Sequence, residues 1–356
     1  MTHRHALVLG KFYPPHAGHH HLIRSAAAVA ERTTVAVLGS SVESLSIADR
    51  VRWIADEHAG DRGVAVLGDL DDHPVDYHDD AIWDLHMGVI RSVLARRAIA
   101  DGDPTGAPVD VVFTSEHYGA ELAARLGAKH VQLDLDRTQF PVSGTAVRAD
   151  PVGQWEFLAP ATRAGLAARI VVVGAESTGT TTLSKALAEH YGAPWVPEHG
   201  RLHTEEKLAA AVALTGNADP AALVWTLGDF LDVAARQAAA EDAAATEPVL
   251  ICDNDPWAAT VWGERYLGRE HPEIAAGDRR PALYLLTDHV GVPFEQDGWR
   301  DGEHLRGWMT ARFVHGLRDR GVPWVLLTGN HEHRLRQAIR ACDAAIRDKF
   351  TFADPL

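Results

Sequence analysis

The sequence is poor in cysteine and has no long apolar run. Cys252 and Cys342 are the two cysteines among 356 residues, whereas a secreted chain of this length usually carries a disulfide framework. No stretch approaches the roughly 18 apolar residues that a membrane-spanning helix needs. The first ten residues also lack the apolar segment of a signal peptide. These absences predict a soluble protein of the cytoplasm, where thiols stay reduced, with no membrane partner.

Positive charge is scarce as well. The sequence has 34 Lys and Arg against 49 Asp and Glu, which gives a formal net charge of −15. This charge balance argues against broad, non-specific binding of nucleic acid. It does not exclude small phosphorylated ligands, because backbone amides and a few local cations can hold those. Hydrophobic residues make up 46% of the chain, so two cores and two domains of ordinary size are expected.

Short, β-branched apolar runs alternate with helix-like stretches through the first half. This alternation predicts parallel sheets covered by helices on both faces, an α/β class with two doubly wound domains. The expected strands of the first half are 7–10, 34–39, 63–68 and 110–114, and its expected helices are 20–32, 48–58, 81–97 and 118–126.

The pattern is interrupted by prolines and glycines at 149–168 and restarts with an apolar run at 169–174. We therefore predict a Rossmann-like first domain at 1–150, a linker at 151–168 and a P-loop-type second domain at 169–356. In the second half, one long Ala-rich helical region is expected at 209–245, and strands are expected at 249–253, 282–286 and 324–328.

A histidine motif follows the first predicted strand. His16 and His19 are three residues apart, so they share a face of the first helical turn, and Gly18 leaves room for a ligand near the backbone. The helix N-terminus adds unpaired N–H groups and partial positive charge. Two imidazoles at this position suit the phosphates of ATP, with Lys11 nearby. Metal binding by His20 and His21 is disfavoured, because consecutive helical residues point in different directions.

A second motif comes near the end of the same predicted domain. Ser143 and Thr145 can cap a helix, and their hydroxyl groups can donate hydrogen bonds to phosphate. The guanidinium group of Arg148 can donate two hydrogen bonds to one phosphate. The HxGH and SxTxxR pair resembles the nucleotidyltransferase superfamily. The strings Gly10–Pro14, Asp49–Trp53, Phe113–Glu116, Ser143–Arg148 and Trp155–Phe157 look like the nicotinamide mononucleotide (NMN) adenylyltransferase half of NadR-type proteins.

This resemblance implies in-line attack of the NMN phosphate on the α-phosphate of ATP, which forms NAD and releases pyrophosphate, helped by Mg²⁺. His16 and His19 are then the catalytic residues, and Lys11, Gly18, Ser143, Thr145 and Arg148 bind ATP. Trp83 would stack on the nicotinamide ring and Arg50 would hold the NMN phosphate. Simple core packing is an equal alternative for Trp83.

The run that opens the second predicted domain has the form of a phosphate-binding loop: a strand, a loop between two glycines, then a helix. The hydroxyl of Thr181 occupies the Mg²⁺-binding position, but Thr180 replaces the usual lysine. The backbone cradle survives this change, whereas a cation near the β- and γ-phosphates is lost. The ATP-binding residues predicted for this loop are Gly174, Ser177, Gly179, Thr180, Thr181 and Thr182.

Two acidic residues end the next strong strand. Asp253 and Asp255 are candidates for metal binding with Thr181, and Asp253 also for catalysis. Arg300, in a Gly-containing segment typical of a mobile lid, is the first candidate to replace the missing cation. Arg201 is the second candidate and Lys185 the third. An ordinary surface turn remains the alternative for the Arg300 segment, and a solvated helix face is the favoured alternative for Lys185.

The second half looks like the ribosylnicotinamide kinase half of NadR-type proteins, with Pro197–Arg201 and Tyr266–Pro272 as further matches. The resemblance implies a bifunctional enzyme that phosphorylates nicotinamide riboside to NMN and adenylylates NMN to NAD. The alternative is an adenylyltransferase whose degenerate P-loop domain is a regulatory module, and a sensor without turnover is disfavoured by the two intact motifs. Some family members carry an N-terminal DNA-binding module, which we expect to be absent because a strand begins near Met1. The sequence leaves homo-oligomerisation open.

Overall fold

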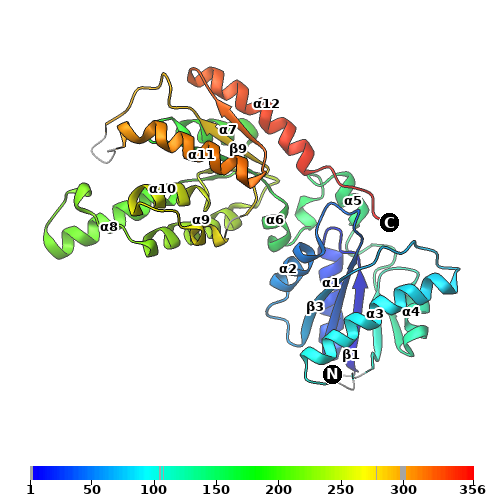
Figure 1. The fold of residues 1–356 in the computed structure, drawn as a ribbon. Coiled ribbons are helices and arrows are strands. Elements are labelled where there is room, and N and C mark those ends of the chain that lie inside the picture. Colours follow the sequence, from blue (N-terminus) through cyan, green and yellow to red (C-terminus); the bar gives the residue numbers. More distant parts are fainter. Residues whose placement is uncertain (1–2, 104–105, 107, 278, 297–301) are drawn as a thin grey trace. The chain divides into compact units, whose positions relative to one another are not determined.

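A computed structural model describes residues 3–103, 106, 108–277, 279–296 and 302–356. The chain forms two compact units, each built on its own parallel sheet (Figure 1). The first unit comprises residues 1–165 together with 350–356, and the second comprises residues 166–349. Within the described part of the chain, no helix is long and apolar enough to cross a membrane.

The sheet of the first unit has five parallel strands in the order β3-β2-β1-β4-β5. Strand order reverses on either side of β1, and ligands of such sheets bind at the carboxyl ends of the strands near this switch point. The strands are β1 (His3–Gly10), β2 (Ala30–Gly39), β3 (Val64–Leu70), β4 (Val111–Thr114) and β5 (Lys129–Gln132).

Helices cover both faces of this sheet. Side chains alternate along β1, so Val8 packs with Ile23 of α1 and Ile54 of α2 on one face. Leu7 packs with Met87 of α3 and with the α4 helix on the other face. The helical segments are α1 (Ala17–Val29), α2 (Ile47–Glu57), α3 (Asp80–Ala100), α4 (Gly119–Leu126), α5 (Gly144–Ala149), the 3₁₀ turn η1 (Trp155–Phe157) and α6 (Pro160–Leu166).

The second sheet also has five parallel strands, in the order β10-β9-β6-β8-β7. The side chain of Val172 on β6 packs with helices α7 and α12 on one face. On the other face, Tyr284 of β9 contacts Trp257, which in turn contacts Phe313 of α11. The strands are β6 (Ala168–Gly174), β7 (Trp195–Val196), β8 (Val249–Asp253), β9 (Leu283–Thr287) and β10 (Trp324–Leu327).

The helical segments of the second unit lie between and after these strands. The α-helices are α7 (Thr180–Tyr191), α8 (His199–Thr215), α9 (Leu227–Ala244), α10 (Ala258–Leu267), α11 (Arg306–Arg320) and α12 (His331–Lys349). The 3₁₀ segments are η2 (Pro220–Ala222), η3 (Pro272–Gly277) and η4 (Glu303–Leu305).

The predicted α/β class with two parallel sheets is confirmed, but two helix predictions are wrong in detail. The helical region expected at 209–245 is interrupted: α8 ends at Thr215, Gly216 adopts a left-handed φ of 71°, and Pro220 follows before α9 begins at Leu227. The first predicted helix ends at Val29 rather than at residue 32. Residues 30–32 instead begin β2, because they pair with β1 from His3 onward.

The segment expected as a linker differs from that expectation. Residues 151–165 belong to the first unit and contain η1 and most of α6. Trp155 is only 5% exposed and packs edge-on against Phe350, from the C-terminal segment of the same unit. Burial of this large indole explains why the segment is ordered against the unit.

The C-terminal segment 350–356 joins the first unit through polar contacts as well. The Tyr13 hydroxyl donates to the carbonyl oxygen of Ala353 at 3.0 Å, and the Ala353 N–H donates to the Ser44 hydroxyl at 2.7 Å. The Lys11 ammonium also donates to the carbonyl oxygen of Leu356. The loop after β1 is thus held by residues from the opposite end of the chain.

Candidate active sites

The histidine motif lies where β1 ends and α1 begins, at the switch point of the first sheet. His16 is the N-cap residue of α1, and its ring stacks on that of His19 with the centroids 3.7 Å apart. The His16 backbone N–H donates to Nδ1 of His19 at 3.3 Å. The predicted shared face of the two imidazoles is therefore present.

Both imidazoles are neutral in the structure. Burial lowers the pKa of His16 to about 3, and burial together with the neighbouring His16 lowers the pKa of His19 well below its usual value. Because Nδ1 of His19 accepts a hydrogen bond, the proton of the neutral ring resides on Nε2. His19 therefore offers a neutral N–H donor to a ligand, rather than a positive charge.

The second motif packs directly against the first. Ser143 caps α5, because its hydroxyl accepts from the Ala146 N–H at 3.0 Å. Arg148 donates from Nη1 to the Tyr13 carbonyl at 2.7 Å and from Nη2 to the Thr145 hydroxyl at 3.4 Å. Glycine at position 18 leaves room for the His16 ring, because a Cβ there would lie only 3.3 Å from it. The structure therefore brings the two predicted motifs together.

Arg50 has a structural role instead of the predicted contact with the NMN phosphate. Its side chain is fully buried and forms an ion pair with the equally buried Glu43, with Nη1 and Oε2 2.7 Å apart. Nη1 also donates to the carbonyl oxygen of Lys11 at 2.7 Å. Arg50 thus fixes the backbone of the loop that leads into the histidine motif.

We expect Glu43→Gln to destabilise the protein by about 3–5 kcal/mol, because it leaves the buried Arg50 guanidinium without its counter-charge. Urea unfolding followed by circular dichroism measures the change. Glu57→Gln is the matched control, since Glu57 pairs with the half-exposed Arg24 and an exposed pair contributes at most about 1 kcal/mol. Equal stability of the two variants would contradict the structural role of the Glu43 pair.

Trp83 lies in the wall of a cavity of about 130 Å³ at the same edge of the first sheet. Its Nε1–H donates to the Tyr77 carbonyl at 3.2 Å, and Arg125 lies over its ring. Lys11 also lines this cavity, and burial lowers its pKa. Trp83 is 6% exposed and packs in the core. It also lines the cavity, so its stacking on a nicotinamide ring stays a prediction.

Sequence reasoning missed other residues of this cavity. Tyr77 and Tyr118 stack with their ring centroids 5.9 Å apart, and Asp71, His73 and His86 form a polar cluster beside them. The Asp-x-His spacing just after β3 was the available signal for the first two residues of this cluster. His86 is missed because it comes from α3, a separate element.

The phosphate-binding loop of the second unit is shaped as its sequence predicts. Gly179 precedes α7 with a φ of 86°, and Ser177 also adopts a left-handed φ of 56°. A Cβ at Gly174 would lie 2.2 Å from the Thr287 hydroxyl, so only glycine fits there. Arg334 donates a hydrogen bond to the Thr178 carbonyl oxygen at 2.9 Å and therefore helps to hold the backbone of the loop in place.

Thr181 and Asp253 meet below this loop, as predicted. The Thr181 hydroxyl donates to Oδ2 of Asp253 at 2.5 Å, and burial raises the pKa of this carboxyl group. Asp255 also lines the cavity, but each of its oxygens already accepts a hydrogen bond. Its Oδ1 accepts from the Ala258 N–H at 2.7 Å and its Oδ2 from the Tyr284 hydroxyl at 2.5 Å. These bonds hold the start of α10 against β9, and the assignment of Asp255 as a metal ligand stays a prediction.

Glu198 is the site residue of the second unit that sequence reasoning did not single out. It immediately precedes α8 and lines the same cavity as the loop and Asp253. Burial raises the pKa of Glu198 to about 7, and the nearby Asp253 charge adds to this rise. A carboxyl group with a pKa near neutrality is suited to accept and release a proton.

The cavity that contains these residues has a volume of about 400 Å³. Part of its wall is aromatic: the ring centroid of Trp225 lies 5.0 Å from that of Tyr266 and 5.4 Å from that of Phe230. The cavity thus combines aromatic side chains with a phosphate-binding loop. This combination suits a molecule that has an aromatic base and a hydroxyl group to be phosphorylated. In the sequence, the signals for this cavity were the Pro197–Arg201 string, which contains Glu198, and the Tyr266–Pro272 string, which contains Tyr266.

The candidates for the missing loop cation differ in position. Arg201 lines the cavity. Lys185 also lines it, and its ammonium lies 4.6 Å from the centroid of the Trp195 ring. Thr180 and Thr182 occupy the first turn of α7. Arg300 lies outside the described residues, so its predicted role is neither supported nor opposed.

The chain is similar to known proteins in sequence and in fold. A family model described as an AAA domain matches residues 169–334. The trifunctional NAD biosynthesis/regulator protein NadR of Escherichia coli (strain K12) is 24% identical over 309 residues, covering 83% of this chain and 71% of that protein. NadR of Salmonella typhimurium is 24% identical over 310 residues, with the same coverage.

Solved structures show the same fold. A crystal structure of NadR in complex with NR superposes with a TM-score of 0.62 at 20% identity and covers 98% of this chain and 97% of that one. A crystal structure of NadR in complex with NAD and AMP-PNP gives a TM-score of 0.61 at 20% identity, covering 97% and 96%. The chain is therefore similar in sequence to the NadR proteins of these two organisms and shares the fold of the solved NadR structures.

Proposed function

We propose that the chain is a bifunctional enzyme of NAD biosynthesis: a nicotinamide riboside kinase in the second unit and an NMN adenylyltransferase in the first. The observation that carries the proposal is that each parallel sheet places a phosphate-binding motif at its switch point, beside a cavity with aromatic walls. Homology to NadR supports both activities. The two cysteines are buried and unpaired, which supports a cytoplasmic location.

In the first unit, the NMN phosphate would attack the α-phosphate of ATP, and pyrophosphate would leave. The neutral His16 and His19 rings, at the N-terminus of α1, would donate hydrogen bonds to the phosphate oxygens as charge develops. The same loop contains Lys11 and lies beside Arg148, Ser143 and Thr145. These residues would position the two substrates, and such positioning provides much of the rate. The aromatic cavity that contains Trp83 would receive the nicotinamide ring.

In the second unit, the amides of the Gly174–Thr181 loop would cradle the ATP phosphates. Thr181 and Asp253 fit a Mg²⁺ site, because a hydroxyl and a carboxylate oxygen converge below the loop and Oδ1 of Asp253 is buried without a hydrogen bond from the described residues. Bound Mg²⁺ would neutralise phosphate charge. Glu198 would accept the proton of the riboside hydroxyl as that hydroxyl attacks the γ-phosphate, and the Trp225–Tyr266 wall would hold the nicotinamide ring.

The direct experiment supplies purified protein with ATP, Mg²⁺ and either nicotinamide riboside or NMN, and identifies the products by chromatography. Riboside should give NMN and then NAD, and supplied NMN should give NAD and pyrophosphate. Formation of NAD from NMN, with no NMN from riboside under any metal condition, would remove the kinase half of the proposal and leave the regulatory-module alternative.

Thr180→Lys should improve the use of ATP by the kinase. A lysine at this position restores a charge-assisted hydrogen bond to phosphate of about 1.5–3 kcal/mol, so the KM for ATP in riboside phosphorylation should fall about tenfold or more. Adenylyl transfer from supplied NMN should not change. Thr180→Gln is the matched control, because it has a long polar side chain without charge, and an equal gain in both variants would contradict the charge argument.

A further inference from the structure

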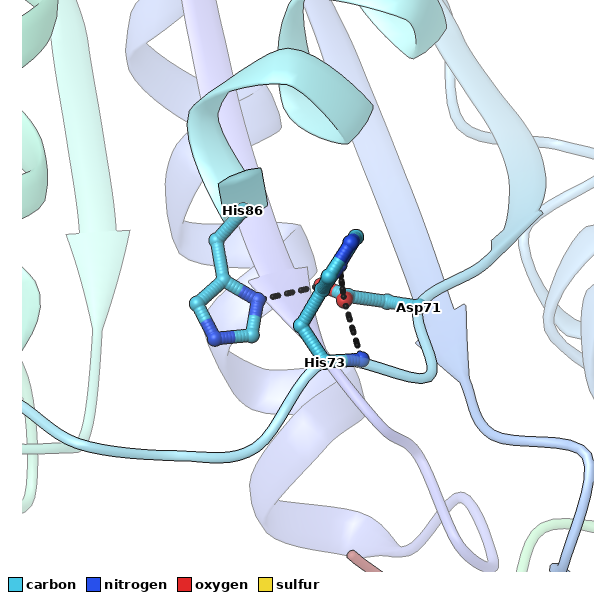
Figure 2. Close-up of side chains that lie close together, drawn as sticks. All are labelled: Asp71, His73 and His86. Carbon is cyan, nitrogen blue, oxygen red and sulfur yellow. Dashed lines mark hydrogen bonds and ion pairs between the residues drawn. The ribbon is translucent and has the colours of Figure 1, made fainter. Parts of the chain in front are cut away.

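A cluster of one carboxylate and two imidazoles lies in the wall of the first cavity. Figure 2 shows Asp71 between the two histidines, with Asp71 and His73 on the segment after β3 and His86 on α3. Nδ1 of His73 lies 2.8 Å from Oδ1 of Asp71, and Nδ1 of His86 lies 2.6 Å from Oδ2. One ligand atom from each of the three residues lies within 4.8 Å of the others.

His86 contacts two hydrogen-bond acceptors through its two ring nitrogens. Its Nε2 lies 3.1 Å from the Pro74 carbonyl oxygen, and its Nδ1 lies 2.6 Å from a carboxylate oxygen of Asp71. A neutral ring carries a single N–H, so it can donate to only one of these two oxygens. The lone pair of its other nitrogen then faces an acceptor. A cation on the Asp71 side, either an added proton or a metal ion, removes this conflict.

The second contact of His86 matches the arrangement of metal-binding histidines. Such residues usually donate the N–H of their other ring nitrogen to a carbonyl or carboxylate, which fixes the ring and its tautomer. Pro74 supplies this carbonyl from the residue after His73. The cluster therefore combines a suitable ligand set with the outer support that holds one of its ligands.

We propose that Asp71, His73 and His86 bind a divalent transition-metal ion, with Zn²⁺ as the best match to one carboxylate and two imidazoles. Ligand atoms of a tetrahedral ion at about 2.1 Å lie roughly 3.4 Å apart, so a small outward movement of the three side chains accommodates it. All three residues line the cavity, which leaves a fourth position for an oxygen of a bound ligand. This site is separate from the Mg²⁺ site proposed at Thr181 and Asp253 of the second unit.

The test is metal binding by the full chain after treatment with a chelator. Calorimetric titration with Zn²⁺ should reveal one tight site in the wild-type protein, and Co²⁺ should give the visible absorption of a four-coordinate ion. His86→Gln and His73→Gln should each weaken this site by more than about tenfold, because even loss of an outer support costs about 10–100-fold. Circular dichroism checks that each variant is folded.

The control is His78→Gln, which removes an exposed histidine from the same segment and should leave the site intact. The proposal is overturned if the wild-type protein and His86→Gln bind Zn²⁺ equally, or if the wild type has no such site. In those cases Asp71 only makes hydrogen bonds with the two imidazoles. Because metal binding is read directly, the result does not depend on whether adenylyl transfer occurs.

Discussion

His19→Ala should lower NAD formation from NMN and ATP by about 10²–10³-fold, the usual cost of removing a preorganised donor to a developing oxyanion. His19 lies at the start of α1 with its Nδ1 occupied by the His16 N–H, so Nε2–H is the group that it can give to a phosphate. Steady-state kinetics with supplied NMN measures the loss. Phosphorylation of riboside should not change, because that site belongs to the second unit.

Two further variants test how His19 acts. In His19→Gln the terminal amide can replace the Nε2–H donor, so part of the lost rate should return if the ring acts as a neutral donor. His21→Ala is the matched control. His21 lies on the same helix, but its ring packs near that of Phe140, with the centroids 5.1 Å apart. Near-normal turnover in His19→Ala would remove this residue from the mechanism.

Glu198→Gln should lower NMN formation from riboside by about 10²–10⁴-fold, the range expected for loss of a general base. In the wild type, kcat/KM for riboside should rise as pH increases through about 7, because the base works in its ionised form and its pKa is raised to about 7. The variant should lose this rise. Glu205→Gln is the matched control, since Glu205 is an exposed residue of the same helix, α8.

Stability gives a second measurement on the same variant. The pKa of Glu198 in the folded protein lies above its ordinary value of 4.5, so the folded state binds more protons than the unfolded state between these values. Wild-type stability should therefore fall as pH rises from about 4.5 to 7. Glu198→Gln should remove this part of the pH dependence and unfold no more readily than the wild type at pH 8. A variant that is both inactive and unfolded would contradict this assignment.

Much of the fold and part of each site could be predicted from the sequence, because the signals are local. A strand, a glycine-containing loop and a helix start follow one another in residues 169–182, and the histidine motif likewise lies between a strand and a helix start. The spacing of His16 and His19 predicts a shared helix face, and the stacked rings confirm it. The Ser143–Arg148 motif could be joined to the first loop only by resemblance, since more than a hundred residues separate them.

What could not be predicted depends on which strands become neighbours and which charges become buried. Burial raises the pKa of Glu198, and the nearby Asp253 charge raises it further, because β7 pairs with β8, the strand that ends at Asp253. Arg50 has the appearance of a phosphate ligand in the sequence, but Glu43, seven residues earlier, neutralises it inside the protein. Asp255 has the appearance of a metal ligand, but a tyrosine from β9 occupies one of its oxygens. Each outcome depends on which groups are buried together in the fold, which the spacing of residues along a helix or strand does not show.

The return of residues 350–356 to the first unit has a consequence for how the two halves can be separated. The second unit is inserted into the first in terms of chain connectivity, because the polypeptide enters it near residue 166 and leaves it near residue 349. A single cut cannot release two complete halves. A fragment that ends at residue 165 would lose the partners of Tyr13, Ser44 and Trp155, and so would expose the loop that leads to His16. An adenylyltransferase module taken from this chain therefore needs its last seven residues supplied, either by circular permutation or as a separate peptide.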